Sequence, residues 1–188
     1  ELTSLGHKFI SSHSDTEVLI HGYKEWGQDL SLHLKGMWSF AIYDKLKKQI
    51  FLSRDRFGEK PLYYLIYKNI FIFSSELKTF NIIKNININI KNTNIKKYCA
   101  YGFFPFNLTP YDNIYQLESG HNLTYRILDN KPIKYKYWDY NIEPNHSIRE
   151  NEWCEKISYL LEKSVKKMLV ADVPVGVFLS GGLDSSII

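Results

Sequence analysis

The residues with the clearest chemical potential lie at the end of the chain, where two glycines stand among serines and an aspartate. The run Ser180–Ser186 reads Ser-Gly-Gly-Leu-Asp-Ser-Ser. Glycines let the backbone adopt a positive φ and approach an anion closely, and serine hydroxyls can donate to phosphate oxygens. The pattern predicts a phosphate-binding loop, although no Gly-Lys-Ser/Thr follows as in a Walker A loop. A glycine turn that only reverses the chain is the structural alternative.

The sequence around this loop predicts the elements that would hold it in place. The apolar, β-branched run 173–179 is typical of a buried parallel strand, and 184–188 begins a helical pattern. The start of that helix would offer unpaired N–H groups and a positive dipole end to an anion. Before the strand, Ser147-Ile148-Arg149-Glu150 has the form of a capping box, and an apolar face continues to Val170. Helix, strand, loop and helix start therefore follow one another.

The first part of the chain predicts a β-rich domain. Short β-forming segments separated by turn residues are expected at 37–43, 49–53, 61–67, 70–74, 121–127 and 133–138. The close spacing of the first four segments predicts antiparallel hairpins and a meander. The last two are expected to form a hairpin around Asp129-Asn130.

Helices are predicted between these strands. Ser14-Asp15-Thr16-Glu17 has the form of a capping box and opens a helix that ends near Gly27. Two short helices are expected at 76–82, capped by Ser75, and at 94–101, ending at Gly102. The Asn/Ile-rich segment 81–97 favours a surface connection, with an edge strand as the alternative.

Composition narrows the class of protein. The 188 residues are 44% hydrophobic and carry a net charge of +4, with scattered lysines that give little support to nucleic-acid binding. The sequence has neither a long apolar run nor a secretory signal pattern, so no membrane partner is expected. Cys99 and Cys154 cannot form a disulfide framework, which predicts a cytoplasmic protein. The six histidines lack metal-ligand spacing, so a structural zinc site is not expected.

Two separate blocks of sequence resemble one enzyme family. The segment 172–186 is similar to the pyrophosphate loop of glutamine-hydrolysing asparagine synthetases. The segments 36–44, 53–64 and 75–78 resemble the closing half of that family's class II glutamine amidotransferase domain. The resemblance implies an α+β N-terminal part, an incomplete Ntn-hydrolase-like αββα glutaminase domain, followed by the start of an α/β doubly wound ATP pyrophosphatase domain.

The implied boundaries place the C-terminal portion of the glutaminase domain at 1–140, a linker at 141–147 and a truncated ATP-binding domain at 148–188. The implied activity is adenylation of the aspartate side-chain carboxylate by ATP with Mg²⁺, followed by amidation with ammonia from glutamine. The expected partners are glutamine, aspartate and ATP. A homodimer is possible, although the sequence contains no signal for one. The alternatives are a related amidotransferase that acts on another carboxylate, such as a uronic acid of a surface polysaccharide, and a non-catalytic relative.

The resemblance also assigns ATP-binding residues. They lie in the loop and at the end of the preceding strand: Phe178, Ser180, Gly181, Gly182, Leu183, Asp184 and Ser185. Phe178 would contribute backbone contacts on the adenine side. Asp184 either approaches Mg²⁺ or only caps the following helix, because aspartate is common in first turns.

The glutaminase half offers one implied contact and no catalytic residue. The family's nucleophile is an N-terminal cysteine, whereas residue 1 is Glu, so these 188 residues alone are expected to be inactive. Asp15 matches the family's aspartate that receives the α-amino group of glutamine, although it could merely favour the helix N-terminus. Cys99 and Cys154 are expected to pack within helices. The charged Arg54-Asp55-Arg56 segment is predicted to stabilise a turn rather than to bind phosphate.

Overall fold

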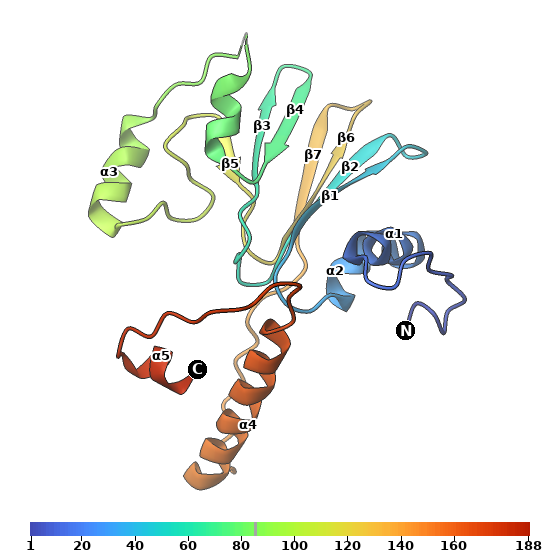
Figure 1. The fold of residues 1–188 in the computed structure, drawn as a ribbon. Coiled ribbons are helices and arrows are strands. Elements are labelled where there is room, and N and C mark those ends of the chain that lie inside the picture. Colours follow the sequence, from blue (N-terminus) through green and yellow to red (C-terminus); the bar gives the residue numbers. More distant parts are fainter. Residues whose placement is uncertain (85) are drawn as a thin grey trace. The chain divides into compact units, whose positions relative to one another are not determined.

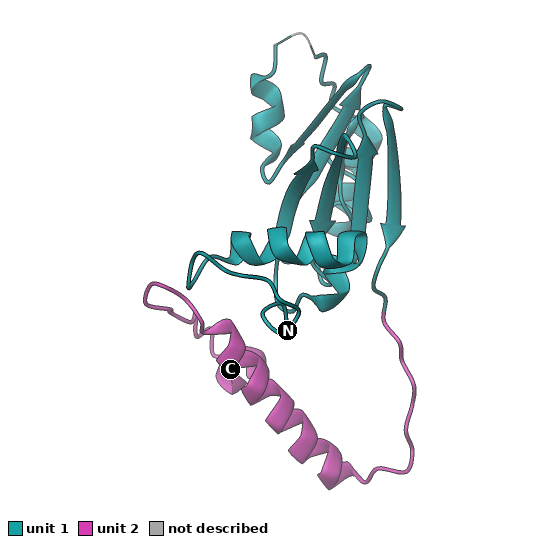
Figure 2. Ribbon diagram, turned by 90° about the vertical axis from the view of Figure 1, so that its right-hand side faces the viewer, with its two compact units in different colours: residues 1–139 teal, residues 140–188 magenta. Residues whose placement is uncertain are grey.

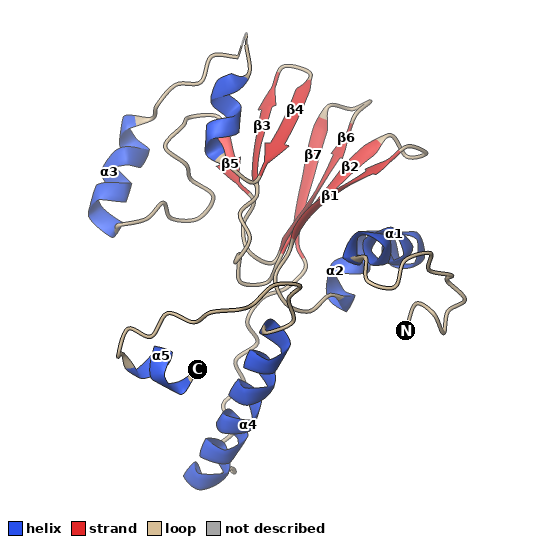
Figure 3. Ribbon diagram, in the orientation of Figure 1, coloured by secondary structure: helices blue, strands red, loops and turns tan. Residues whose placement is uncertain are grey.

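The computed structural model describes residues 1–84 and 86–188. Its chain divides into two compact units, unit 1 (Glu1–Asp139) and unit 2 (Tyr140–Ile188), coloured teal and magenta in Figure 2. Every strand of the described residues belongs to unit 1, whereas unit 2 consists of helices and loops (Figure 3).

Four antiparallel strands form the larger sheet of unit 1. In order across the sheet they are β1 (Ser39–Asp44), β2 (Gln49–Arg54), β6 (His121–Arg126) and β7 (Lys131–Lys136). Two of the predicted hairpins, β1–β2 and β6–β7, lie in this sheet and are confirmed. The predicted meander is wrong, because β2 pairs with β6 rather than with the next strand in sequence. A turn after β2, anchored by the buried Asp55, leads the chain into a second sheet.

The second sheet has three antiparallel strands. Their order is β4 (Ile70–Ser74), β3 (Tyr63–Tyr67) and β5 (Ile114–Gln116). The β3–β4 hairpin was predicted, whereas β5 was not. With only three residues, β5 is too short to show an alternating pattern, and its pairing of Ile114 with Leu65 joins distant parts of the sequence.

The two sheets pack face to face around an apolar core. Leu52 and Leu123 from the larger sheet and Tyr64 from the smaller one belong to the same buried cluster. The rings of Phe71 and Tyr125, one from each sheet, stack with centroids 4.3 Å apart. The sheets of unit 1, seen in Figure 1, therefore form the two central layers.

The outer faces of both sheets are covered as well, because neighbouring residues of a strand point to opposite faces. Phe51, next to Leu52, packs with Tyr23 and Leu30 of the N-terminal helices. Leu65, next to Tyr64, packs with Phe80 of a 3₁₀ helix. The layers follow one another as helix, sheet, sheet and helix, in agreement with the αββα arrangement expected for this part of the chain.

The first helix begins and ends where its capping residues predict. Helix α1 (Asp15–Trp26) has Ser14 as its N-cap, whose hydroxyl accepts from the Glu17 N–H at 3.3 Å, and ends at Gly27 with φ +57°. A 3₁₀ turn, Gly27–Asp29, leads into α2 (Leu30–His33).

The helical elements between β4 and β5 differ in detail from the prediction. The segment expected to be a Ser75-capped helix is the 3₁₀ helix η2 (Leu77–Ile82), and the hydroxyl of Ser74 accepts from the Glu76 N–H. Helix α3 (Asn92–Tyr101) ends at Gly102, as predicted. In the Asn/Ile-rich segment before it, residue 85 lies outside the described residues; the described part is a connection with one isolated bridge, Ile90 to Tyr111.

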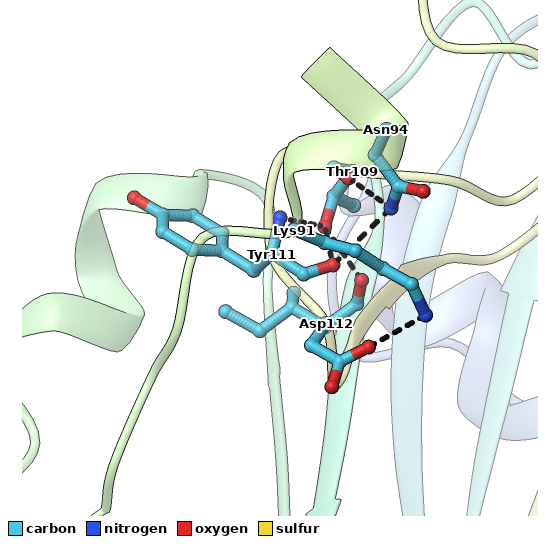
Figure 4. Close-up of polar contacts among 6 residues, drawn as sticks. Lys91, Asn94, Thr109, Tyr111 and Asp112 are labelled. Atoms are coloured by element: carbon cyan, nitrogen blue, oxygen red, sulfur yellow. Dashed lines mark hydrogen bonds and ion pairs between the residues drawn. The ribbon is translucent and has the colours of Figure 1, made fainter. Parts of the chain in front are cut away.

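Within unit 1, polar contacts hold helix α3 against the segment before β5, and Figure 4 draws those among Lys91, Asn94, Thr109, Tyr111 and Asp112. The buried Asn94 side chain donates to the Thr109 carbonyl at 2.8 Å. The Lys91 N–H donates to the Pro110 carbonyl at 2.9 Å, and the Lys91 ammonium pairs with Asp112 at 2.6 Å. These contacts join the start of the helix to the segment that leads into β5.

Unit 2 contains the long helix α4 (Glu150–Met168). The helix begins two residues further along the chain than predicted, because Arg149 is the N-cap and its N–H donates to Glu152 at 3.1 Å. Ser147 instead donates through its N–H and its hydroxyl to Asn145. No helix in the described part of the chain combines the length and apolarity that a bilayer span requires.

The strand predicted at 173–179 is absent. This segment has an irregular backbone, and Val173 is 69% and Phe178 99% exposed. A buried strand needs neighbouring strands for its ladder hydrogen bonds, and no strand of residues 1–84 or 86–188 pairs with this segment. The helix predicted after the loop does form, as α5 (Leu183–Ile187). The start of a doubly wound domain therefore stays a prediction.

Candidate functional site

The glycine loop of unit 2 forms a tight turn at the start of α5. Gly181 has φ +79°, a backbone conformation that side chains with a Cβ disfavour, and a Cβ there would meet open space. The Ser180 and Ser185 hydroxyl oxygens lie 2.9 Å apart, across the turn. The loop thus combines an open glycine backbone with two adjacent hydroxyl groups.

The Gly182 carbonyl is the centre of this loop. It accepts from the hydroxyls of Ser185, at 3.1 Å, and Ser186, at 2.8 Å, and from the Ser186 N–H at 3.1 Å. Asp184 is exposed in the first turn of α5. The structure therefore brings the serines of the predicted ATP-binding set together. The open approach at Gly181 leaves room for a phosphate group, whose oxygens could replace these hydrogen bonds within the loop.

A cavity of unit 2 lies away from this loop. A cavity of about 430 Å³ lies between α4 and α5, and its apolar lining includes Leu161, Val165, Leu169 and Ile187. None of the predicted ATP-binding residues lines it. We therefore assign it no part in nucleotide binding.

Asp15 stands at the first residue of α1 with an exposed side chain. Its Oδ1 accepts from the Thr16 N–H at 2.8 Å. A carboxylate in this place is stabilised by the positive end of the helix dipole and is accessible to an ammonium group from solvent. The geometry fits both a contact with the α-amino group of glutamine and a purely structural role at the helix N-terminus.

The sequence interpretation missed the role of Glu17. A capping box would direct its carboxylate back to the Ser14 N–H, but the carboxylate instead accepts from the N–H groups of Ile10, at 2.6 Å, and Ser11, at 2.8 Å. Hydrogen bonding by the Ser11 hydroxyl, together with these two N–H groups, lowers the pKa of Glu17 to about 2. The Ser-x-x-Glu spacing was a correct signal for the helix start but not for the partner of the glutamate.

The charged turn after β2 is structural, as predicted. Asp55 is fully buried and accepts at 3.0 to 3.3 Å from the backbone N–H groups of Trp38, Phe57, Glu59 and Lys60. The buried Arg54 guanidinium donates to the carbonyls of Gly58, Lys60 and Leu117. Burial lowers the pKa of Arg54, while Asp55 opposes that shift. These donors and acceptors are committed to the fold, which argues against a phosphate site.

The expectation that both cysteines pack within helices is wrong. Cys99 on α3 and Cys154 on α4 are both exposed. A position on a helix does not imply burial, because α3 buries only Asn94. Within the described ranges, no group of three or more His, Cys, Asp and Glu side chains is arranged to hold a metal ion.

Two known families match this chain, one in each of its two units. Residues 1–138 match the glutamine amidotransferase domain, and residues 156–188 match asparagine synthase. The chain belongs to the glutamine-hydrolysing asparagine synthetase family. The residues assigned to glutamine in this family member lie in the first matched segment, and those assigned to ATP lie in the second.

Several relatives of this asparagine synthetase family member match almost its whole length. A putative glutamine-hydrolysing asparagine synthetase 2 of Methanocaldococcus jannaschii is 43% identical over 176 residues, covering 92% of this chain and 34% of the relative. Asparagine synthetase 3 of Bacillus subtilis is 36% identical over 192 residues, covering 100% and 30%. Amidase chry2 of Gibberella zeae is 30% identical over 196 residues, covering 95% and 26%. The chain spans about a third of the length of these curated relatives.

Proposed function

We propose that the chain is the glutaminase and ATP-loop portion of a glutamine-dependent asparagine synthetase. The observation that carries this proposal is the succession of the two matched segments on one chain, with the Ser180–Ser186 loop in the second. An amidotransferase segment releases ammonia from glutamine. A neighbouring synthetase segment gives that ammonia an activated carboxylate, here the side chain of aspartate, to attack.

In the first segment, we assign Asp15 to glutamine. Its exposed carboxylate at the start of α1 can accept charge-assisted hydrogen bonds from the α-ammonium group of the substrate. The nucleophile that attacks the glutamine amide is not among the residues that this site brings together, and we assign no described cysteine to that step.

In the second segment, we assign the phosphates of ATP to the loop that starts at Ser180. The Ser180 and Ser185 hydroxyls, 2.9 Å apart, would donate to phosphate oxygens in place of their hydrogen bonds within the loop, together with N–H groups at the start of α5. Asp184 is the residue of this loop that could hold Mg²⁺, which would stabilise the charge that develops on the phosphate oxygens. Phe178 would contact the adenine side through its backbone.

The overall reaction can be tested with the complete gene product. Supplied with ATP, Mg²⁺, aspartate and glutamine, it should form asparagine, AMP, pyrophosphate and glutamate in equal amounts. Formation of glutamate without AMP and pyrophosphate would contradict the synthetase part of the proposal.

The loop assignment can be tested by ATP binding. We expect Ser180→Ala and Asp184→Ala each to weaken ATP affinity about tenfold, because each removes one polar contact to a charged group. Ser164→Ala, an exposed serine on α4, is the matched control and should leave the affinity unchanged. Equal affinities in all four proteins would contradict the assignment.

A second candidate keeps the glutaminase and the ATP loop but uses another acceptor carboxylate. It is favoured by the 30% identity to a protein named amidase chry2, which extends over 95% of this chain. The same assay distinguishes the two candidates. Aspartate would fail to support pyrophosphate release, while a different carboxylic acid, such as a uronic acid, would restore it.

A further inference from the structure

The segment that precedes α1 is held against that helix by a stripe of polar side chains. Glu17, His21 and Glu25 lie at intervals of four residues and therefore share one face of α1. Each of them contacts the segment 7–11. We call these three residues the α1 stripe.

Glu17 makes the closest set of contacts in the α1 stripe. Its two carboxylate oxygens accept separately, Oε1 from the Ile10 N–H at 2.6 Å and Oε2 from the Ser11 N–H at 2.8 Å. The Ser11 hydroxyl also donates to Oε2. The backbone N–H of Glu17 donates to the Ser14 hydroxyl. Both ends of the segment 10–14 are thus bonded to one residue.

His21 and Glu25 hold the earlier part of the segment. The Nδ1 atoms of His7 and His21 lie 3.1 Å apart, and the Phe9 ring packs against His21 with centroids 4.7 Å apart. The other nitrogen of His7 is 3.0 Å from Glu25. His21 in turn lies 3.5 Å from Glu17, so the stripe forms one connected network.

Asp15 follows this restrained segment directly. We propose that Glu17 is a positioning residue for glutamine binding, which sets the path of residues 10–14 and hence the direction in which Asp15 presents its carboxylate. This inference depends on the proposed function of Asp15. Glu17 does not face the substrate itself, because both of its oxygens already accept hydrogen bonds from the segment.

The substitution Glu17→Gln tests this role with little change in shape. Glutamine has one carbonyl oxygen where glutamate has two acceptors, so one of the two N–H groups would face an NH₂ group. We expect the KM for glutamine of the complete gene product to rise about tenfold while kcat changes less than twofold. Synthesis from free ammonia, which bypasses glutamine, should stay unchanged.

Glu76→Gln is the matched control, because Glu76 is exposed and its ion-pair partner is Lys78. It should leave every kinetic constant as in the unaltered protein. If Glu17→Gln does not fold, Ser11→Ala removes one donor to the same carboxylate and should raise the KM by a smaller factor.

The outcomes separate this inference from the proposed function. Absence of glutamine hydrolysis in the unaltered protein would overturn the proposed function. Normal hydrolysis together with an unchanged KM in Glu17→Gln or Ser11→Ala would overturn only the positioning role. Equal losses of glutamine-dependent and ammonia-dependent synthesis would also overturn it, because they would indicate general damage to the protein.

Discussion

The Asp55 turn of unit 1 and the Ser180–Ser186 loop of unit 2 both combine glycine with polar side chains, yet they direct those side chains to different partners. Asp55 is fully buried, and four backbone N–H groups donate to it. Asp184 is exposed. The hydroxyls of the loop bond to one another or to the Gly182 carbonyl. Charge and glycine content therefore do not identify a binding site. The two loops differ in exposure, because Asp55 is buried with its partners whereas the hydrogen bonds of the Ser180–Ser186 loop lie at the surface, where a ligand could replace them.

The same contrast extends to apolar residues. In unit 1, Leu65 and Phe51 are fully buried between layers. In unit 2, α4 carries an apolar face on which Ile157 is 51% and Leu161 42% exposed. The stability of unit 1 should therefore respond strongly to changes in its interior, whereas unit 2 should respond weakly.

The largest effect is expected from Asp55→Ala, which leaves four N–H groups without their acceptor. We expect the free energy of unfolding of the 188-residue chain to fall by about 3 to 5 kcal/mol, as for other buried charged groups that lose a partner. Urea unfolding would measure the change. Asp129→Ala removes an exposed ion pair with Arg126 and should change the value by less than about 0.5 kcal/mol. Similar losses of unfolding free energy in both variants would contradict the expectation that the buried carboxylate contributes more than the exposed one.

The next largest loss of stability is expected when a buried leucine is replaced, and an exposed leucine serves as the comparison. Leu65→Ala should lower the free energy of unfolding by about 3 kcal/mol, because it opens a cavity in the interior. Leu161→Ala on α4 should change it by less than about 0.5 kcal/mol, as at other surface positions. A large loss at Leu161 would mean that the apolar face of α4 is covered in solution.

A smaller effect on the stability of the chain is expected at alkaline pH. Burial is the main cause that raises the pKa of Tyr64 to about 12. Because the folded pKa exceeds the unfolded value of about 10, the contribution of Tyr64 is complete below pH 10 and is lost as the pH rises through 12. The urea midpoint of Tyr64→Phe should therefore fall less steeply between pH 9 and 12 than that of the unaltered chain. The matched control is Tyr43→Phe, at a position 55% exposed, and an equally reduced slope there would contradict the explanation.

The smallest effect concerns the cysteines, one in each unit. Both thiols should react with a disulfide reagent such as DTNB in the folded chain, because both are exposed. Cys99→Ser and Cys154→Ser should each remove one equivalent without changing stability. A thiol that reacts only after denaturation would show that the helix carrying it is covered.

Much of unit 1 could be predicted from sequence because its signals are local. Ser14 and Gly27 mark the ends of α1, and Gly102 marks the end of α3. The structural role of Asp55 was also predicted correctly. These features depend on residues a few positions apart, whose backbone preferences and capping contacts operate within one turn.

The errors arose where a partner lies outside the local pattern. Glu17 bonds to the segment before the helix rather than to its own N-cap, and Arg149 replaces Ser147 as the cap of α4. The apolar run 173–179 has the composition of a buried strand but no neighbouring strand among the described residues. Composition alone could not supply that neighbour.

The sequence by itself determined the positions of the hairpins, both ends of α1, the C-terminal end of α3 and the glycine loop, because side-chain alternation and capping chemistry are encoded within short windows. Only the tertiary structure decided that β2 pairs with β6, that Phe51 and Leu52 face different layers, and that Glu17 restrains the segment leading to Asp15. The physical reason is that burial and hydrogen-bond partners depend on residues far apart in the chain, whose contacts no local pattern specifies.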